Sequence, residues 1–317
     1  MSSTALDRFD ADRFEASRNR LASLAYRMLG SAVDAEDAVQ DTFLRWQAAD
    51  RRRIDVPEAW LTKVVTHLCL DRLRSAHARR ERSAGAWLPE PLLEGDPLLG
   101  PAETAEQRES VSLAVLLLME RLSPVERAVY LLYEAFSYRH GEIAEMLDIT
   151  ESTSQQHLHR ARRRVTAARR RGRNEVDPAS ARRIVEEFLD AAVSGRIDRL
   201  VPLLTDDATA ISDGAGLTEK LLRYDTPERI AAIARVGFQP SPAKRRLAGG
   251  TPAIYYALVN GAPAILIVVG DHVVGAVTFD LLDGKIVTVR GIAAPARLVR
   301  LTDSWRRHAD APLIAEW

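Results

Sequence analysis

The sequence is poor in cysteine, with Cys69 as the one thiol in 317 residues. A single thiol excludes an intramolecular disulfide framework and a cysteine-rich zinc site, and it is ordinary for a protein of a reducing compartment. Apolar runs are short as well. None approaches the roughly 18 residues that cross a bilayer, and the first twenty residues are polar and charged. We therefore expect a soluble, cytoplasmic protein with no membrane partner, and we expect Cys69 to lie in a core.

Net charge, internal repeats and glycine-rich phosphate loops are also absent. Forty-four basic residues balance 44 acidic residues, so the overall charge indicates no partner, although the charges are segregated locally. His67 has no second residue at the spacing of a metal ligand, and we expect neither a metal nor a cofactor. A length of 317 residues suits two or three domains, each with a core of its own.

The segment from His140 to Arg173 has the pattern of a helix-turn-helix. A short helix with one apolar face, a tight turn at Asp148 and Ile149, and a capping residue, Thr150, precede a longer helix. After Glu151 that helix contains only neutral and basic residues, a composition suited to phosphate. Its arginines, and those just beyond it, are Arg160, Arg162, Arg163, Arg164, Arg169, Arg170, Arg171 and Arg173.

A 100° step per residue separates the faces of this longer helix. Ser154, Leu158, Ala161 and Val165 are expected to face inward. The outward or flanking candidates for DNA contact are Ser152, Thr153, Gln155, Gln156, Arg160 and Arg163. The alternative is a solvated, arginine-rich surface helix, but the caps, the turn and the basic face agree with one another and favour DNA contact.

An acidic stripe follows Gly30. The helix that begins near Asp34 has Val39, Phe43 and Trp46 as its predicted core face, and Asp34, Asp37 and Asp41 share the opposite side. The preference of acids for a first helical turn explains Asp34 but not Asp41, two turns further on. Binding of a partner and simple solvation both remain open for this stripe.

A second basic region lies on the helix predicted from Trp60 to Arg80, after Pro57. Its inward face contains Leu61, Val64, Val65 and Leu68. Lys63, His67 and Arg74 fall on the outer face, and Arg72 lies beside them.

The residues that follow, 83–107, are rich in proline and acids and predict an extended linker. Four residues of this segment are nevertheless apolar enough to dock on a neighbouring domain: Trp87, Leu88, Leu92 and Leu93. A capping box at Ser123 and Glu126 then opens the helix before the helix-turn-helix.

The C-terminal part changes to an α+β pattern. An amphipathic helix from Pro178 to Ser194 precedes a β-rich region in which Asn260-Gly261 and Asp283-Gly284 are strong hairpin signals. Strands are predicted near 208–212, 254–259, 262–269, 272–281 and 285–291, with a helix near 227–236. A curved antiparallel sheet with helices packed on it is the expected fold of this part.

Three of these segments, in this order, resemble the extracytoplasmic-function sigma factors of bacterial RNA polymerase. They are DAEDAVQDTFLRWQ (34–47), PEAWLTKVVTHLCLDRLR (57–74) and SPVERAVYLLYEAFSYRHGEIAEMLDIT with LHRARRR (123–150 and 158–164). The resemblance implies that Asp34, Glu36, Asp37, Gln40 and Asp41 bind core polymerase. It also implies that Lys63, His67, Arg72 and Arg74 contact the −10 element, and that the second helix of the helix-turn-helix reads the −35 element.

The C-terminal part resembles the SnoaL-like domains of the NTF2-like superfamily, and sigma factors that carry such a domain. The matching segments are Trp87 to Pro91, Asp213 to Gly216 and, in reduced form, Ala294 to Leu298. Leu217 stands where relatives often have a basic residue. The resemblance implies interdomain roles for Trp87, Leu88, Pro89, Asp213 and Gly214, and a small molecule in this domain is a further candidate partner.

The sequence thus predicts a multidomain protein in which an extended linker joins two all-α sigma domains and an α+β NTF2-like cone follows. The expected boundaries are 1–82 for the −10 and polymerase domain, 83–107 for the linker, 108–174 for the −35 domain and 175–317 for the SnoaL-like domain. The predicted function is that of a promoter-specificity subunit whose activity the C-terminal domain modulates.

Two alternative functions are consistent with parts of the sequence. A one-component, ligand-sensing regulator has no need for the acidic stripe and the second basic helix. An enzyme needs a buried carboxylate or a His/Asp pair in the cone, and Asp213, Asp225, Asp280 and His272 are the available groups. Most of them lie at predicted turns or strand ends, where solvation is the simpler account, so we expect no catalytic residue.

Overall fold

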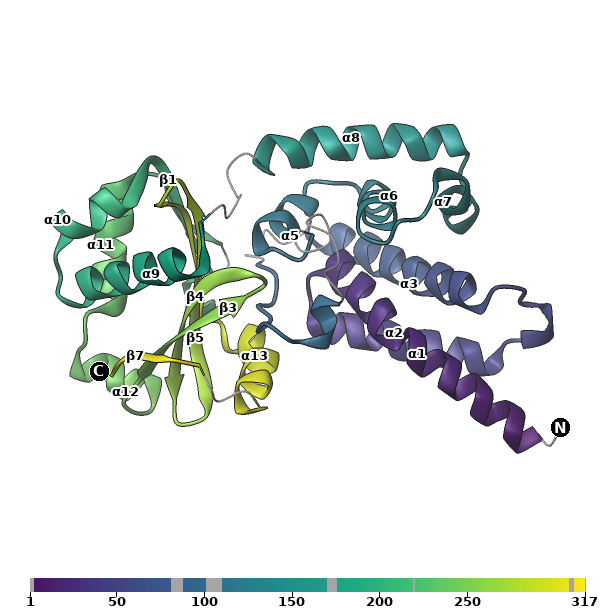
Figure 1. Cartoon of the computed structure of the whole chain (residues 1–317), viewed down its shortest axis with the longest axis horizontal. Coiled ribbons are helices and arrows are strands. Elements are labelled where there is room, and N and C mark those ends of the chain that lie inside the picture. Colours follow the sequence, from purple (N-terminus) through teal and green to yellow (C-terminus); the bar gives the residue numbers. More distant parts are fainter. Residues whose placement is uncertain are drawn as a thin grey trace. The chain divides into compact units, whose positions relative to one another are not determined.

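The computed structural model (Figure 1) describes residues 3–80, 88–100, 110–169, 176–218, 220–307 and 311–316. The chain forms two compact units. The first combines residues 1–83 with 95–167, and the second combines 84–94 with 168–317. The chain therefore passes from the second unit to the first at Gly95, inside the segment predicted as a linker.

Three helices make the N-terminal half of the first unit: α1 (Ser3–Leu29), α2 (Ala32–Ala48) and α3 (Pro57–Arg80), with the 3-10 turn η1 (Arg51–Arg53) before α3. α1 ends where Gly30 adopts a φ of 66°. Ser31 caps α2 by accepting a hydrogen bond from the Asp34 N–H at 3.2 Å. The three helices pack pairwise and bury Cys69, as predicted, and this burial raises the pKa of the Cys69 thiol to about 12.

The second half of this unit contains η2 (Pro97–Leu99), α5 (Leu113–Met119), α6 (Pro124–Glu134), α7 (His140–Leu147) and α8 (Glu151–Arg169). The predicted capping box is present, since the Ser123 N–H donates to Glu126 and the Glu126 N–H donates to Ser123 Oγ. α7 ends at Asp148 with a φ of 55°, and Thr150 Oγ1 caps α8 by accepting from the Thr153 N–H at 3.1 Å. The helix-turn-helix is confirmed.

The second unit is built on a seven-stranded sheet in the order β2-β1-β6-β5-β4-β3-β7. Its strands are β1 (Leu204–Ser212), β2 (Leu222–Tyr224), β3 (Ala253–Val259), β4 (Ala262–Val269), β5 (His272–Leu282), β6 (Lys285–Ile292) and β7 (Leu313–Glu316). Its helices and 3-10 turns are α9 (Pro178–Val193), α10 (Ile197–Leu200), η3 (Val201–Leu203), η4 (Gly214–Gly216), α11 (Pro227–Phe238), α12 (Pro242–Ala248) and α13 (Pro295–Arg307). The α+β character is as predicted.

Both hairpin predictions are confirmed. Asn260 and Gly261 have φ values of 51° and 75° between β3 and β4, and Asp283 and Gly284 have 50° and 75° between β5 and β6. The sheet is mixed rather than purely antiparallel, because β1 runs parallel to β6. Hairpin signals specify only strands that are consecutive in the chain, and four strands, β2 to β5, lie between β1 and β6 in the sequence.

Helices cover both faces of this sheet. α9 and α11 form one core with the face that carries Phe279 and Ile254. Tyr255, the next residue on β3, packs on Trp305 of α13 with ring centroids 4.6 Å apart. Successive strand residues point to opposite faces, so α13 lies on the other face. The elements β2, α12, α13 and β7 were not predicted.

Candidate functional site

The outer face of α8 is open to solvent. Ser154, Leu158, Ala161 and Val165 are buried, as the helical spacing predicted, and Ser154 Oγ lies 2.9 Å from His140 Nδ1. The residues predicted for DNA contact fall on the other side. Ser152, Gln155, Gln156, Arg160 and Arg163 are exposed, and Thr153 is half-buried. The first two turns therefore present short polar side chains, the type that reads base edges.

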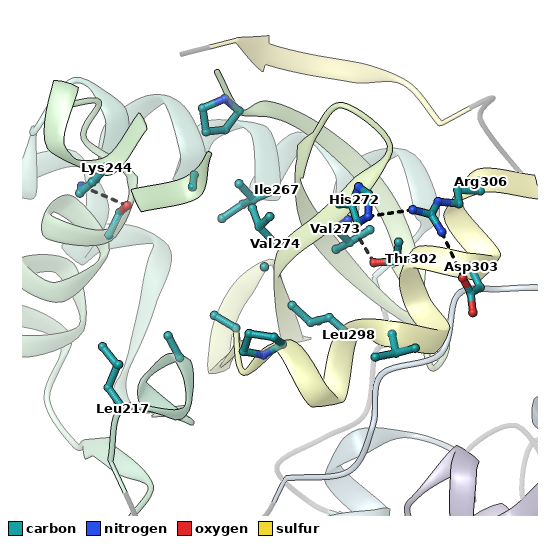
Figure 2. A pocket seen from close by; sticks show the side chains of 18 residues that line it. Leu217, Lys244, Ile267, His272, Val273, Val274, Leu298, Thr302, Asp303 and Arg306 are labelled. Carbon is teal, nitrogen blue, oxygen red and sulfur yellow. Dashed lines mark hydrogen bonds and ion pairs between the residues drawn. The ribbon is translucent and has the colours of Figure 1, made fainter. Parts of the chain in front are cut away.

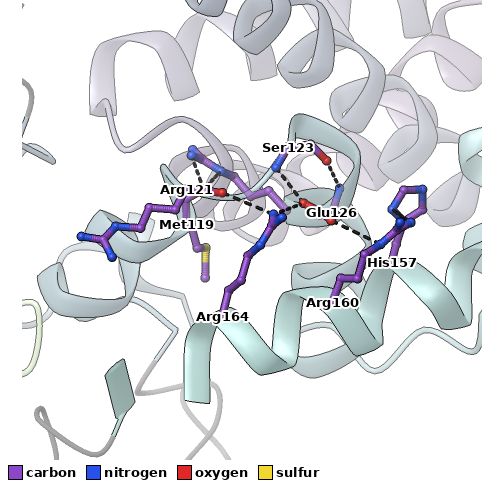
Figure 3. A network of polar contacts seen from close by, with 8 residues as sticks. Met119, Arg121, Ser123, Glu126, His157, Arg160 and Arg164 are labelled. Atoms are coloured by element: carbon purple, nitrogen blue, oxygen red, sulfur yellow. Dashed lines mark hydrogen bonds and ion pairs between the residues drawn. The ribbon is translucent and has the colours of Figure 1, made fainter. Parts of the chain in front are cut away.

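Ion pairs fasten α8 to α6 (Figure 3). Glu126 Oε2 lies 2.7 Å from Arg164 NH1, and Glu126 Oε1 lies 3.5 Å from Arg160 Nε. Arg162 Nε makes a similar contact with Glu134 Oε1 at 2.6 Å. Arg163 is exposed and has no ion-pair partner within the described part of the chain. The arginines that look equivalent in sequence thus have different partners in the fold.

Two residues of the predicted −10 set lie against the helix-turn-helix. Lys63 Nζ of α3 donates to Asp148 Oδ1 at 3.0 Å and to the Glu145 carbonyl oxygen at 2.9 Å. His67 Nε2 lies 2.7 Å from the Met146 carbonyl oxygen. The hydrogen bond and the charge of Lys63 hold the pKa of Asp148 below its ordinary value. The structure thus joins α3 to the turn that precedes α8.

Other contacts extend this interface within the first unit. Thr62 Oγ1 and Tyr138 Oη lie 3.0 Å apart, and Arg20 donates to the Phe136 carbonyl oxygen at 3.2 Å. Arg127 NH1 donates to the Met28 carbonyl oxygen at 2.6 Å. Arginine is well suited to such joints because its planar head makes several hydrogen bonds at once. The two helical halves are therefore one packed body here.

Arg72 and Arg74, the other two −10 candidates, have different surroundings. Arg72 NH2 donates to Asp41 Oδ2 of α2 at 2.9 Å. Arg74 is exposed and pairs with Asp71 at 3.3 Å. Arg72 therefore connects the predicted DNA-contacting helix with the predicted polymerase-binding stripe, two surfaces that the sequence pattern treated as separate.

The acidic stripe on α2 has an apolar component that sequence reasoning missed. Asp34, Glu36, Asp37 and Gln40 are exposed, and Asp41 is half-buried beside Arg72. Val33 and Leu44 are 58% and 53% exposed on the same helix. The spacing of residues 33, 37, 40 and 44 places them on one face. That spacing was visible in the sequence as an apolar pair outside the predicted core face.

The linker segment before Gly95 is part of the second unit. The Leu92 N–H donates to Asn260 Oδ1 and the Asn260 N–H donates to the Leu92 carbonyl oxygen, both at 2.8 Å. Glu94 N–H donates to the Leu258 carbonyl oxygen at 3.0 Å. Leu88 is 1% exposed, Leu92 and Pro89 are buried, and Arg297 of α13 donates to the Leu88 carbonyl oxygen. Trp87 lies outside the described residues.

Asp213 joins two of the motif segments. It is buried, and its carboxylate accepts hydrogen bonds from the N–H groups of Ala215, Ala293 and Ala294 at 3.0 Å. The residue that follows it, Gly214, has a φ of 60°. The turn after β1 is thereby tied to the start of α13, and α13 holds the linker through Arg297. Three segments far apart in sequence meet in the second unit.

The linker segment after Gly95 belongs to the first unit. Asp96 caps η2 by accepting from the Leu98 N–H at 2.9 Å. Arg27 of α1 is buried, donates to the Leu99 carbonyl oxygen at 3.0 Å and to Ser110 Oγ at 2.8 Å, and burial lowers its pKa to about 10. Gly100 has a φ of 69°, and a Cβ there would overlap the side chain of Ser23, so this position requires glycine.

A pocket of about 870 Å³ lies in the second unit (Figure 2). Its lining is largely apolar and comes from η4, α12, β4, β5 and α13, with Leu217, Ile267, Val274, Leu298 and Val299 among the contributors. At one side Arg306 donates to Asp271 Oδ2 at 2.8 Å and approaches His272 Nε2 at 2.8 Å. Asp271 compensates the charge of Arg306, and Lys244 Nζ, which also lines the pocket, donates to the Gln239 carbonyl oxygen at 2.6 Å. The pocket is therefore suited to an uncharged, apolar molecule.

The carboxylates available for catalysis are not arranged for proton transfer. Asp280 is buried and forms a bidentate ion pair with Arg290. Asp225 is exposed and pairs with Arg229. His272 does line the pocket, and its partner Asp271 has a pKa held below the ordinary value by the hydrogen bond from Arg306. A carboxylate with a lowered pKa is a weak base. Within the described residues, no three His, Cys, Asp or Glu side chains cluster as metal ligands would.

Among the described residues, no helix is both long enough and apolar enough to cross a bilayer.

Family models match both helical halves of the first unit. Sigma-70 region 2 matches residues 13–80, and Sigma-70 region 4 matches residues 112–165. The first match contains α2 and α3, and the second contains the helix-turn-helix.

Individual relatives agree with these matches. The ECF RNA polymerase sigma factor SigJ of Mycobacterium tuberculosis is 38% identical over 214 residues, which is 68% of each chain. The probable ECF RNA polymerase sigma factor SigI of the same organism is 30% identical over 290 residues, 90% of this chain and 93% of the relative. The crystal structure of SigJ superposes with a TM-score of 0.66 at 30% identity, covering 90% of this chain and 97% of that one.

Proposed function

Because this chain belongs to the extracytoplasmic-function sigma factors of RNA polymerase, which direct polymerase to promoters and are not enzymes, we propose a division of that task among its surfaces. α2 binds core polymerase, α3 contacts the −10 element and α8 reads the −35 element. The observation that carries this assignment is the outer face of α8. Polar residues in its first two turns precede the exposed Arg163, and an ion pair between Arg164 and Glu126 holds the opposite side of the helix against α6. A one-component regulator is not favoured by the family.

The −35 assignment separates reading from anchoring. Ser152, Gln155 and Gln156 lie in the first two turns of α8, the part of a recognition helix that meets base edges. Arg163 lies further along and suits a phosphate. Selection from a library of promoters with randomised −35 elements tests this. We expect Gln156→Ala to change the selected bases, and an unchanged preference would remove Gln156 from the readers.

The polymerase assignment combines charge with apolar contact. Exposed Val33 and Leu44 lie beside Asp37 and Gln40, a pattern that suits a partner groove with a basic rim. Full burial of one such side chain contributes about 1.5–3 kcal/mol, and about 1.4 kcal/mol is a tenfold change in affinity. Because only part of this area converts to affinity, a Val33→Ser, Leu44→Ser double variant should bind core polymerase at least about tenfold more weakly. Val236→Ser, which changes an exposed valine of α11 in the other unit, is the matched control. Equal weakening in both proteins would contradict the assignment.

Promoter binding requires the two halves of the first unit to separate. The −10 and −35 elements lie about 25 base pairs apart, or about 85 Å along a duplex at 3.4 Å per base pair. Lys63 on α3 touches Asp148, which lies three residues before α8 begins. While Lys63 touches Asp148, α3 and α8 are too close together to contact both elements at once. We call this packed arrangement of the two halves the closed state and the separated arrangement the open state. The closed state therefore precedes promoter binding.

The C-terminal domain, which has the NTF2-like fold, would regulate this separation through the linker. The linker is held on one side by Asn260 and Arg297 and on the other by Arg27, with Gly95 between the two attachments. α13 contributes both Arg297 and one wall of the pocket, so an uncharged apolar molecule in the pocket could act on the linker through this helix.

Two measurements test this regulatory role. Transcription from a cognate promoter, at matched polymerase saturation, should differ between the full chain and a fragment of residues 1–177; equal transcription would exclude intrinsic regulation. Nile red, an uncharged apolar dye, should fluoresce on binding the full chain, and Val274→Glu should abolish this signal by placing a charge in the pocket at a half-buried position. Unchanged fluorescence would place the dye elsewhere.

A further inference from the structure

Glu126 occupies an unusual place for a helix-capping residue. Its N–H and its carboxylate complete the capping box with Ser123 at 3.3 Å and 3.0 Å, which satisfies the start of α6. The same carboxylate faces α8 and contacts Arg160 and Arg164 with its two oxygens (Figure 3). Its side chain is 6% exposed, whereas both arginines are about half exposed, at 52% and 50%. A buried anion thus lies beneath two cations of the DNA-facing helix.

The charge of Glu126 is maintained by these neighbours. Burial raises the pKa of this carboxyl, but the Ser123 hydrogen bonds and the charges of Arg164 and Arg160 outweigh burial and hold the pKa below its ordinary value. An ionised carboxylate at this depth needs its cations, since an unpaired buried charge is costly. The pairing therefore constrains the arginines as much as the acid.

We propose that Glu126 is a positioning residue that withholds Arg160 and Arg164 from DNA phosphates and so limits sequence-independent binding by α8. Each arginine that neutralises a phosphate adds affinity for any sequence and carries no base information. An arginine drawn toward α6 by a buried carboxylate is less able to do so, and this applies to Arg160 although its place on α8 made it a candidate for DNA contact. Arg163, exposed on the same helix, remains for backbone contact. The inference rests on the proposed function, because it assumes that α8 faces duplex DNA.

The test is the variant Glu126→Gln in the full chain. Glutamine keeps the capping box, so α6 retains its start, and only the charge is removed. Binding to a random-sequence 30-base-pair duplex is measured by fluorescence anisotropy over a series of KCl concentrations. Two released arginines should steepen the slope of log affinity against log salt by up to about 1.8, and affinity at low salt should rise about tenfold.

Glu142→Gln is the matched control. Glu142 accepts a hydrogen bond from the Arg139 N–H at 2.7 Å in the next helix, so this variant also removes one negative charge from a helix start of the same domain. It contacts no arginine of α8 among the described residues. A general electrostatic effect would change both variants alike, whereas the proposed role changes Glu126→Gln alone.

A triple variant separates positioning from folding. Adding Arg160→Gln and Arg164→Gln to Glu126→Gln should return the salt slope to or below that of the wild type, because the released cations are gone. A wild-type slope in Glu126→Gln, or a steep slope that persists in the triple variant, would overturn the inference while leaving the proposed function in place. Absence of duplex binding by the wild-type chain would overturn both.

Discussion

Two basic surfaces of the first unit, the outer faces of α3 and α8, look alike in sequence and differ in the structure. On α8 the predicted DNA-contacting residues are exposed, and the ion pairs of the helix come from behind, from α6. On α3, Lys63 and His67 already contact the helix-turn-helix, and Arg72 contacts α2. A helix face that is basic in sequence can therefore already be in contact with other parts of the protein. Under the proposed roles, the −10 surface has to exchange several protein contacts for DNA, whereas on the −35 surface Gln155, Gln156 and Arg163 are exposed and Arg160 is paired with Glu126.

The largest expected effect breaks the α3 side of this comparison. A Lys63→Ala, His67→Ala double variant should lower promoter melting by holoenzyme by about a hundredfold, because two polar contacts of about 1.5 kcal/mol each are lost. Permanganate reactivity of the −10 thymines measures melting. Binding of a −35 duplex by the isolated chain is the control and should stay unchanged, and an equal loss there would show that the contacts with DNA are not confined to α3.

A smaller effect is expected on α8. Arg163→Ala should weaken every promoter and every random duplex alike, by roughly five- to tenfold at low salt, and should reduce the salt slope by about 0.9, the value for one phosphate. Gel-shift titrations with three unrelated sequences measure this. Weakening of one sequence alone would mean that Arg163 reads bases, which would reverse its assigned role.

Asp148→Asn tests the contact that distinguishes the two surfaces. Asparagine tolerates the left-handed backbone of this position, so the turn is kept while the charge opposite Lys63 is lost. Because an exposed ion pair is weak, we expect only a two- to fivefold increase in the fraction of molecules in which α3 and α8 are separated. Lower energy transfer between dyes on α3 and α8 measures this separation. Asp71→Asn, which breaks the exposed pair with Arg74, is the control and should leave the transfer unchanged.

The smallest effect concerns pH and α8. Burial and the charge of Arg160 hold the pKa of His157 below its ordinary value of about 6.5. A histidine with a lowered folded pKa stays neutral above about 6.5, and its contribution to stability is lost only as the pH falls below that value. Duplex affinity should therefore be flat between pH 7 and 8.5, and unfolding by urea should become easier only below about pH 6.5. A higher duplex affinity at pH 7.5 than at pH 8.5 would contradict this.

Much of the local structure could be predicted because its causes are local. The capping box at Ser123, the turn at Asp148 and the hairpins at Asn260 and Asp283 depend on side chains and φ values within a few residues. α13 was missed although its signal was present, since Pro295 is followed by Leu298, Leu301 and Trp305 at helical spacing. β7 was missed because a four-residue edge strand has too short a pattern to recognise.

The sequence by itself determined the helix-turn-helix, the two basic helices, the acidic stripe and the family, because periodicity, caps and motif order are properties of neighbouring residues. Only the tertiary structure decided which charges are already partnered. Lys63 meets Asp148 across 85 residues, Arg164 meets Glu126 across 38, and Leu92 meets Asn260 across 168. A charged side chain can be satisfied by solvent, by DNA or by a distant residue, and the choice depends on which helices the packing of the core brings together.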